Sequence, residues 1–354
     1  MESKDQSNKS VSGHLNPDLK KQFANQRRRE LSISEYMDGI LSGDRVILSQ
    51  AITLIESKRP VHRSLAKELI EKCLAHSARS IRIGITGTPG VGKSTFIETL
   101  GQHLIAEGHR LAVLAIDPTS QVSKGSILGD KTRMGKLANA EAAFIRPSAA
   151  GDSLGGVARK TREAIILCEA AGFDTLIIET VGVGQSETAV HSMVDFFLLL
   201  ILPGAGDELQ GIKRGIVEMA DLIAVNKADG EREKLAKQAR QAYRNALHLF
   251  PPTESGWVPK VVTCSALSNM GIAEIWSIVE NYQKFCTKNG FFERRRSEQA
   301  GFWLREHIDQ GLRELFYENK AVREHWKKVE EMVEKRKISS FKGAEELLEL
   351  FLKG

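Results

Sequence analysis

The sequence predicts an α/β protein built on a doubly wound, mostly parallel β-sheet. Between residues 81 and 286, short apolar segments alternate with longer amphipathic segments, which is typical of strands alternating with helices. The first apolar segment runs directly into the glycine-rich sequence GTPGVGKST. Polar and acidic residues follow the later apolar segments, as expected where ligands bind at the carboxyl ends of parallel strands. The 354-residue chain is long enough for this domain with additions at both ends.

The composition describes an ordinary globular protein, with 42% hydrophobic and 27% charged residues. The net charge of +5 comes from basic residues interleaved with acidic ones, so we expect no nucleic-acid partner. The four cysteines are widely spaced and the histidines form no H-x-x-x-H pair, which argues against disulfides and zinc sites. Residues 1–12 lack the apolar core of a signal peptide, and residues 196–202 are too few to span a membrane. We therefore expect a cytoplasmic protein without a membrane partner.

The amino-terminal residues 1–80 are predicted to form a helical extension. Roughly the first 16 residues are polar and expected to be disordered. Apolar positions then recur with helical spacing in residues 33–41, 45–55 and 61–75. Glycine at position 43 and proline at position 60 mark the breaks between these helices.

The α/β core is predicted to span residues 81–286. The expected strands are residues 81–85, 111–116, 142–145, 175–179, 194–202, 222–225 and 260–263. The expected helices are residues 94–107, 157–171, 212–219, 231–249 and 272–285. Strands that alternate with helices in this way form parallel pairs through right-handed crossovers.

After residue 286 the strand signals stop, and residues 287–354 are predicted to be helical. Residues 293–317, 322–335 and 339–352 are charged, amphipathic segments. They contain too few apolar residues to fold as an independent compact core. Two arrangements remain open: a helical arm that packs on another chain, or helices that lie back on the core.

The glycine-rich sequence between Gly87 and Ser94 fits G-x-x-x-x-G-K-S/T, the phosphate-binding loop. Its backbone N–H groups and the positive end of the following helix can bind anionic phosphates. Lys93 can reach the β- and γ-phosphates, and the Ser94 hydroxyl can ligate Mg²⁺. The predicted nucleotide contacts are Gly87, Pro89, Gly90, Val91, Gly92, Lys93, Ser94 and Thr95.

A second loop predicts the base. The sequence Asn226-Lys227-Ala228-Asp229 follows a predicted strand. The Asp229 carboxylate can accept hydrogen bonds from N1–H and the 2-amino group of guanine, a pair of donors that adenine lacks. Lys227 can lie over the base and Asn226 can brace the loop, while Ser265 and Ala266 suit a backbone contact to the guanine oxygen. The sequence thus predicts GTP and GDP as ligands.

Two acids predict a metal site. Asp117 and Glu179 are expected at the ends of neighbouring strands beside the phosphate loop, and Mg²⁺ in phosphoryl transfer is held by one or two carboxylates. Gly182 can offer its N–H to the γ-phosphate, and its release would move residues 183–187. Asp130 and Lys213 lie in or beside glycine-containing loops that can close over the γ-phosphate; solvated surface charge is the alternative reading of both.

These motifs, in this order, resemble the methylmalonyl-CoA mutase-associated GTPases, the MeaB/ArgK group that includes the human methylmalonic aciduria type A protein. The resemblance rests on GTPGVGKST, AIDPTS, GSILGDKTRM, IRPS, LGGV, IIETVGVGQSE, LPGAGDELQGIKRGI and NKAD. It runs from about residue 65 to the C-terminus and is dense between residues 83 and 229. It implies a metallochaperone-type P-loop GTPase of the signal-recognition-particle-like class, which dimerises through its carboxy-terminal helical arm.

The resemblance also implies a function. Members of the family act as chaperones of an adenosylcobalamin-dependent acyl-CoA mutase, gate its cofactor loading and protect it, and the mutase stimulates their GTP hydrolysis. Carried over by position, Lys93 and Ser94 bind phosphate and Mg²⁺, and Asp117 and Glu179 complete the metal shell. The implied catalytic residues are Lys93, Asp130, Glu179 and Lys213. Asp130 falls in switch I, residues 179–187 form switch II, and residues 203–213 form switch III.

Other function classes remain open. A metal-delivery GTPase is one, although the sequence lacks a His/Cys cluster. A GTP-binding regulatory module without useful turnover is another. An arginine/ornithine transport ATPase, an older name in this group, is disfavoured by the guanine loop and by the absence of a predicted membrane segment. We expect slow, Mg²⁺-dependent hydrolysis of GTP by an oriented water, without a covalent intermediate.

Overall fold

A computed structural model describes residues 31–57, 59–77, 80–116, 134–147, 154–180, 186–204 and 214–353. These residues form a seven-stranded sheet in the order β3-β2-β4-β1-β5-β6-β7, and every pairing is parallel. The strands are β1 Ile81–Gly87, β2 Leu111–Ile116, β3 Ala143–Arg146, β4 Thr175–Thr180, β5 Phe196–Ile201, β6 Leu222–Val225 and β7 Lys260–Thr263. The predicted α/β class and every predicted strand are confirmed. The expected disorder of residues 1–16 lies outside the described residues.

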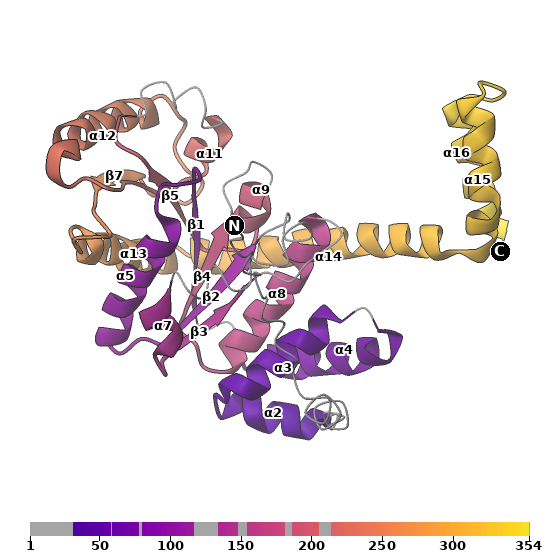
Figure 1. Ribbon diagram of the computed structural model, residues 1–354, viewed down its shortest axis with the longest axis horizontal. Helices are drawn as coiled ribbons and strands as arrows, with labels where there is room; N and C mark the ends of the chain where they lie inside the picture. Colours follow the sequence, from indigo (N-terminus) through magenta and orange to yellow (C-terminus); the bar gives the residue numbers. More distant parts are fainter. Residues whose placement is uncertain are drawn as a thin grey trace, which may run out of the picture.

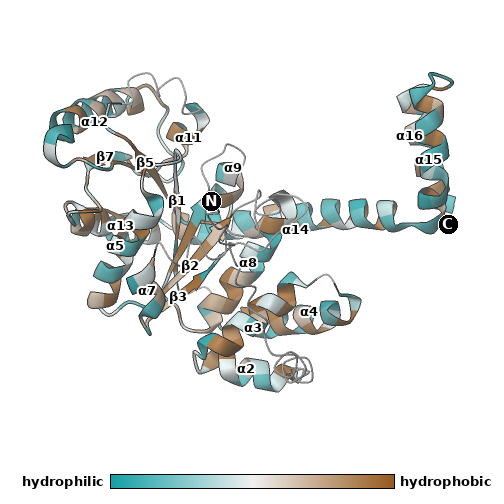
Figure 2. Ribbon diagram, in the orientation of Figure 1, coloured by the Kyte–Doolittle hydropathy of each residue, from teal (hydrophilic) through white to brown (hydrophobic). Residues whose placement is uncertain are grey.

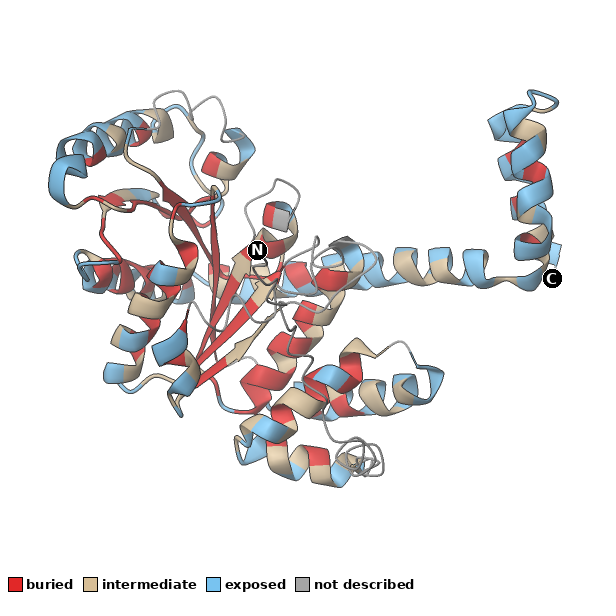
Figure 3. Ribbon diagram, in the orientation of Figure 1, coloured by how far each residue is buried: buried red, intermediate tan, exposed pale blue. Residues whose placement is uncertain are grey.

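The sheet is buried on both faces, which explains why its strands read as apolar runs. Helices α5 (Lys93–Ala106) and α13 (Ile272–Lys288) contribute Phe96, Trp276 and Tyr282 to the cluster on one face. Helices α8 (Leu154–Ala170) and α9 (Ser186–His191) contribute to the cluster on the other face. Figure 3 shows the buried residues concentrated in the sheet and in the helix sides that face it.

The amino-terminal helices pack on the outside of α8. They are α2 Ile33–Leu41, α3 Arg45–Glu56 and α4 Pro60–Leu74. Ser32 and Glu35 form a capping box at the start of α2, and the Asp44 carboxylate caps α3. The buried Ile40, Leu48 and Ile52 belong to the same hydrophobic cluster as α8 and β2, so these helices share the core of the sheet domain.

Three short helices and one longer helix complete the described part of the core. They are α7 Gly135–Asn139, α11 Arg214–Glu218, the 3₁₀ turn η1 Gly230–Arg232 and the longer α12 Glu233–Leu247. The sequence had given no separate helix for α7 or α9. Helices of five or six residues complete too few turns to show an apolar period.

The carboxy-terminal helices project away from the core. Helix α14 (Phe291–Glu318) has 28 residues, which corresponds to about 42 Å at 1.5 Å per residue. Figure 1 shows it leaving the sheet domain and carrying α15 (Lys320–Glu334) and α16 (Ser340–Lys353) at its far end. These two helices pack on each other around Val322, Val329 and Leu347. The three helices therefore do not lie back on the core, which was one of the two arrangements that the sequence left open (Figure 1).

Figure 2 shows hydrophobic colour concentrated in the strands and hydrophilic colour along much of α12 and α14. Within the described ranges, no helix combines the length and the apolar character that a membrane crossing requires.

Candidate nucleotide site

The phosphate loop joins β1, near the middle of the sheet, to α5. A Cβ at Gly87 would collide with the carbonyl oxygen of Leu200 in β5, so this position requires glycine. Gly92 has φ 94° and is the N-cap of α5, a left-handed conformation that other residues adopt only with strain. These two glycines therefore allow the loop to lie against β5 and to turn sharply into α5, whose N-terminus can bind a phosphate group.

Lys93 is buried at the start of α5. Its Nζ donates hydrogen bonds to the Gly87 carbonyl at 2.7 Å and the Thr88 carbonyl at 3.4 Å. Burial lowers the pKa of Lys93, and the charges of Glu179 and Glu187 act in the opposite direction. The ammonium group is thus held inside the loop, bonded to carbonyls that phosphate oxygens can replace as acceptors.

The guanine loop follows β6 and is bonded directly to the phosphate loop. Asn226 is almost fully buried; its Nδ2 donates to the Val91 carbonyl at 2.9 Å, and its Oδ1 accepts from the Ala266 N–H at 3.1 Å. Lys227 has φ 59°, and its Nζ donates to the Gly90 carbonyl at 2.8 Å. The structure therefore brings together three loops, and the phosphate loop precedes the other two by more than a hundred residues in the sequence.

A cavity of about 540 Å³ opens between these loops, within the range typical of small-ligand pockets. Its lining includes the predicted Gly92, Thr95, Asn226, Lys227, Asp229, Ser265 and Ala266. It also includes Glu231, Arg232 and the highly exposed Leu267, which the sequence reasoning missed. These three adjoin the predicted motifs in the sequence, and that adjacency was the only available signal.

The predicted metal ligands are described only in part. Ser94 lies half-buried in the first turn of α5, and Glu179 lies half-buried at the penultimate position of β4. Both offer oxygen atoms, the ligand type that Mg²⁺ prefers, and the charge of Glu179 reaches Lys93. The described donors thus fit a magnesium site beside the phosphate loop. Asp117, Asp130, Gly182 and Lys213 lie outside the described residues.

In the described ranges, no group of three or more His, Cys, Asp and Glu side chains could hold a metal by itself. Glu187, in the first turn of α9, is only 3% exposed, and its charge acts on Lys93. It ends the segment that the sequence analysis assigned to switch II, but it was given no individual role there.

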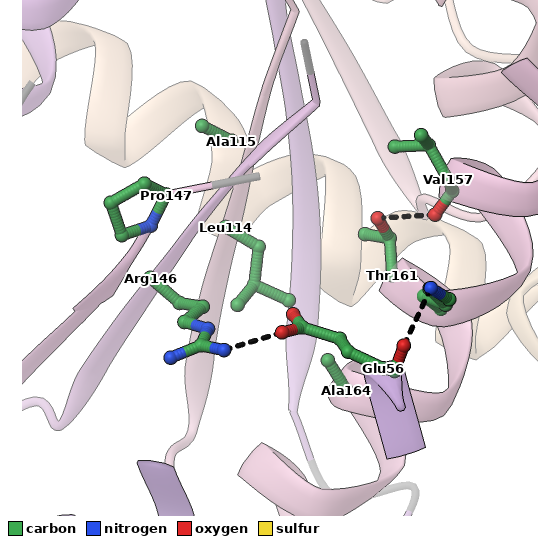
Figure 4. A pocket seen from close by; sticks show the side chains of 9 residues that line it. Glu56, Leu114, Ala115, Arg146, Pro147, Val157, Thr161 and Ala164 are labelled. Atoms are coloured by element: carbon green, nitrogen blue, oxygen red, sulfur yellow. Dashed lines mark hydrogen bonds and ion pairs between the residues drawn. The ribbon is translucent and has the colours of Figure 1, made fainter. Parts of the chain in front are cut away.

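A second, much smaller cavity lies between α3, β2, β3 and α8, lined by residues shown in Figure 4. An Arg146–Glu56 ion pair of 2.5 Å borders it, and the Lys160 Nζ donates to the Glu56 carbonyl at 2.7 Å. Its volume of about 20 Å³ admits a water molecule and no more. These contacts fasten the end of α3 to the edge of the sheet.

Comparison with known proteins places the chain among GTPases. The profile of a family described as "Methylmalonyl Co-A mutase-associated GTPase MeaB" matches residues 48–321. The chain is 43% identical to GTPase ArgK of Escherichia coli, over 90% of this chain and 97% of that protein. It is 44% identical to the mitochondrial methylmalonic aciduria type A homolog of Mus musculus, over 88% of this chain and 78% of that protein.

A solved structure matches this chain along most of the length of both chains. It is described as the crystal structure of an LAO/AO transport system kinase. It is 38% identical to this chain, with a TM-score of 0.72, and the match covers 91% of this chain and 98% of that one.

Proposed function

Because the chain belongs to the MeaB family of methylmalonyl-CoA mutase-associated GTPases, we propose that it is a Mg²⁺-dependent GTPase that acts as a chaperone of an adenosylcobalamin-dependent acyl-CoA mutase in the cytoplasm. Methylmalonyl-CoA mutase is the client that the family name favours. In this proposal the GTP- and GDP-bound states control cofactor loading into the mutase and its protection during turnover.

The observation that carries the nucleotide part of the proposal is the bonding of the guanine loop to the phosphate loop. Through Asn226 and Lys227, the position of the base pocket is fixed relative to the phosphate site. Asp229 lies at the rim of that pocket, where its carboxylate can accept from guanine. A base held there therefore delivers its phosphates to the N-terminus of α5.

In the proposed mechanism, the protein promotes hydrolysis by positioning the triphosphate and by placing positive charge beside its oxygens. Lys93 would exchange the Gly87 and Thr88 carbonyls for the β- and γ-phosphate oxygens. Ser94 and Glu179, with Asp117, would hold Mg²⁺, which when bound neutralises charge on those oxygens. Asp130, Gly182 and Lys213 complete the site that we propose for hydrolysis by water.

A stripe on α14 supports the homodimer in this proposal. Leu304, Ile308, Leu312 and Leu315 recur at four-, four- and three-residue spacing, and each side chain is 51–63% exposed. Such a row of large apolar side chains on an extended helix is unfavourable in water. A second copy of the same stripe would cover it through a two-fold symmetric contact.

The deciding experiment measures GTP hydrolysis with and without a purified adenosylcobalamin-dependent acyl-CoA mutase from the same source. We expect stimulation together with a stable complex, and we expect neither with the Lys93→Ala variant, which lacks the phosphate-binding ammonium group. Hydrolysis that the mutase leaves unchanged, without a complex, would refute the chaperone proposal while leaving the GTPase site intact. A titration with nickel or cobalt would then test delivery of a metal to another enzyme.

A further inference from the structure

Helix α9 lies between the phosphate loop and the first part of α14, residues 295–303, which we call the root of the carboxy-terminal arm. At its beginning, α9 carries the buried Glu187, and the helix contacts β4, the strand that carries Glu179. At its end, the chain passes through the junction Ser192–Asp195 into β5. The two ends of this one short helix therefore face different parts of the molecule.

The packing of α9 on the sheet leaves it little freedom to shift. It lies against β1, the strand that leads into the phosphate loop. A Cβ on Gly84 of that strand would come within 2.9 Å of Val190 Cγ1 and 3.1 Å of Val194 Cγ2. The glycine thus permits an approach that is too close for any other residue, and a displacement of α9 would open a gap over β1.

The root of α14 holds the other side of this junction. Four residues of α14 bond to the end of α9 and to the junction. Arg295 Nη2 lies 3.0 Å from His191 Nε2, and Arg296 Nε donates to Asp195 Oδ1 at 2.9 Å. Gln299 Nε2 donates to the Val194 carbonyl at 2.8 Å, and Trp303 Nε1 donates to the Ser192 carbonyl at 3.0 Å. The spacing of these α14 residues, three or four apart after the first pair, puts them on one face of the helix. One face of the arm's root therefore binds almost every residue of the junction.

We propose that the root of α14 is a positioning element for GTP hydrolysis, in which Gln299 and Trp303 hold the Ser192–Asp195 junction and so keep α9, with its buried Glu187, against β1 beside the phosphate loop. Neither residue touches the nucleotide pocket. Their effect on turnover passes through the position of α9. The inference depends on the GTPase activity of the chain and not on the identity of its client.

This arrangement couples the direction of the arm to the state of the nucleotide site. Rotation of α14 would break the hydrogen bonds to the Val194 and Ser192 carbonyls unless the junction and α9 moved with it. Coupling of this kind is reciprocal: a partner that turns the arm changes the nucleotide site, and a change of nucleotide changes the preferred direction of the arm.

The experiment replaces the two donors separately with apolar side chains of similar shape. Gln299→Met removes the amide that bonds to Val194, and Trp303→Phe removes the indole N–H but keeps a ring beneath the Arg162 guanidinium, now 5.1 Å from the tryptophan ring. We expect each variant to lower kcat by about fivefold, with KM for GTP and the affinity for GDP within about twofold of the parent. Gln310→Met is the matched control, because that amide bonds to Glu314 of its own helix, and we expect its kcat to be unchanged.

A double-mutant cycle separates positioning from a general loss of stability. Glu187→Gln should itself lower kcat. In the double variant Glu187→Gln/Trp303→Phe, the fold loss in kcat should be smaller than the product of the two single fold losses, because both substitutions act through α9. Unchanged kcat in both α14 variants would overturn the proposal, as would effects of Glu187→Gln and Trp303→Phe that simply multiply, since independent sites behave in that way.

Discussion

Asn226 is the residue through which the guanine loop and the phosphate loop become a single site. Its amide donates to Val91 on one side and accepts from Ala266 on the other, and it is buried. From the sequence, it could be assigned only a bracing role within its own loop. That its two partners belong to the two other nucleotide-binding loops follows from the order of the strands in the sheet.

Asp229 should determine the choice of base. In Asp229→Asn an amide replaces an acceptor of the two guanine donors, and its NH₂ group can instead donate to the 2-oxygen of xanthine. We expect the affinity for GTP to fall by at least about tenfold and the affinity for xanthosine triphosphate to rise. Competition binding measures both. Glu233→Gln, on the exposed face of α12, should leave the preference unchanged; an unaltered preference in Asp229→Asn would contradict the assignment of the loop.

His191 should make the stability of the protein fall in acid. Burial, followed by the charge of Arg295, lowers its pKa from 6.5 to about 3, so the folded protein holds the ring neutral while the unfolded chain binds a proton. The unfolded state therefore takes up more protons between pH 6.5 and 3. The contribution of His191 to the free energy of unfolding is fully present above pH 6.5. It decreases as the pH falls below that value, by about 1.4 kcal/mol per pH unit.

The variant His191→Gln tests this by removing the titration while keeping an acceptor for Arg295. Urea unfolding at pH 7, 6 and 5 should show a shallower loss for the variant than for the parent. Asp221, whose pKa burial raises to about 6, changes stability in the opposite direction over this window, but it does so in both proteins. Parallel curves for the two proteins would show that the fold does not lower the pKa of His191.

At the scale of elements, a buried ion pair joins β1 to α8. Arg82 donates to both oxygens of Glu169, at 2.8 and 3.0 Å, and the Ser80 hydroxyl donates to the same carboxylate. Both side chains are buried. This pair could not be predicted from the sequence, because its members are 87 residues apart and each looks like an ordinary surface charge.

Replacing one member of the Arg82–Glu169 pair should destabilise the fold, because the charge of the other member stays buried without a partner. Arg82→Met should lower the free energy of unfolding by about 3–5 kcal/mol. The double variant Arg82→Met/Glu169→Met should regain most of that loss, since two apolar side chains can fill the space without a buried charge. Denaturant unfolding measures both variants. A loss below about 1 kcal/mol in the single variant would show that water reaches this pair.

At the scale of the whole molecule, the arm is the feature with the least contact to the rest of the chain (Figure 1). Beyond its root, α14 shows the apolar stripe of Leu304, Ile308, Leu312 and Leu315 to solvent. We expect Ile308→Glu/Leu312→Glu to convert a dimer into a monomer, because charges there could not be buried between two copies. Light scattering after gel filtration measures this. Gln310→Glu, which places a charge away from the stripe, should remain dimeric, and a double variant that also stays dimeric would refute this interface.

The sequence by itself determined the strands, the phosphate loop and the guanine loop. These depend on residues that are neighbours in the chain: apolar runs that form buried strands, glycines that permit a left-handed turn, and an acid that fits guanine. Only the tertiary structure decided that Asn226 bonds the loops together, that Glu187 is buried at the start of α9, that α14 bonds to the end of α9 and to the junction after it, and that the arm extends away from the core (Figure 1). Each of these depends on contacts between segments far apart in the sequence, where no local period or spacing records which partner a side chain meets.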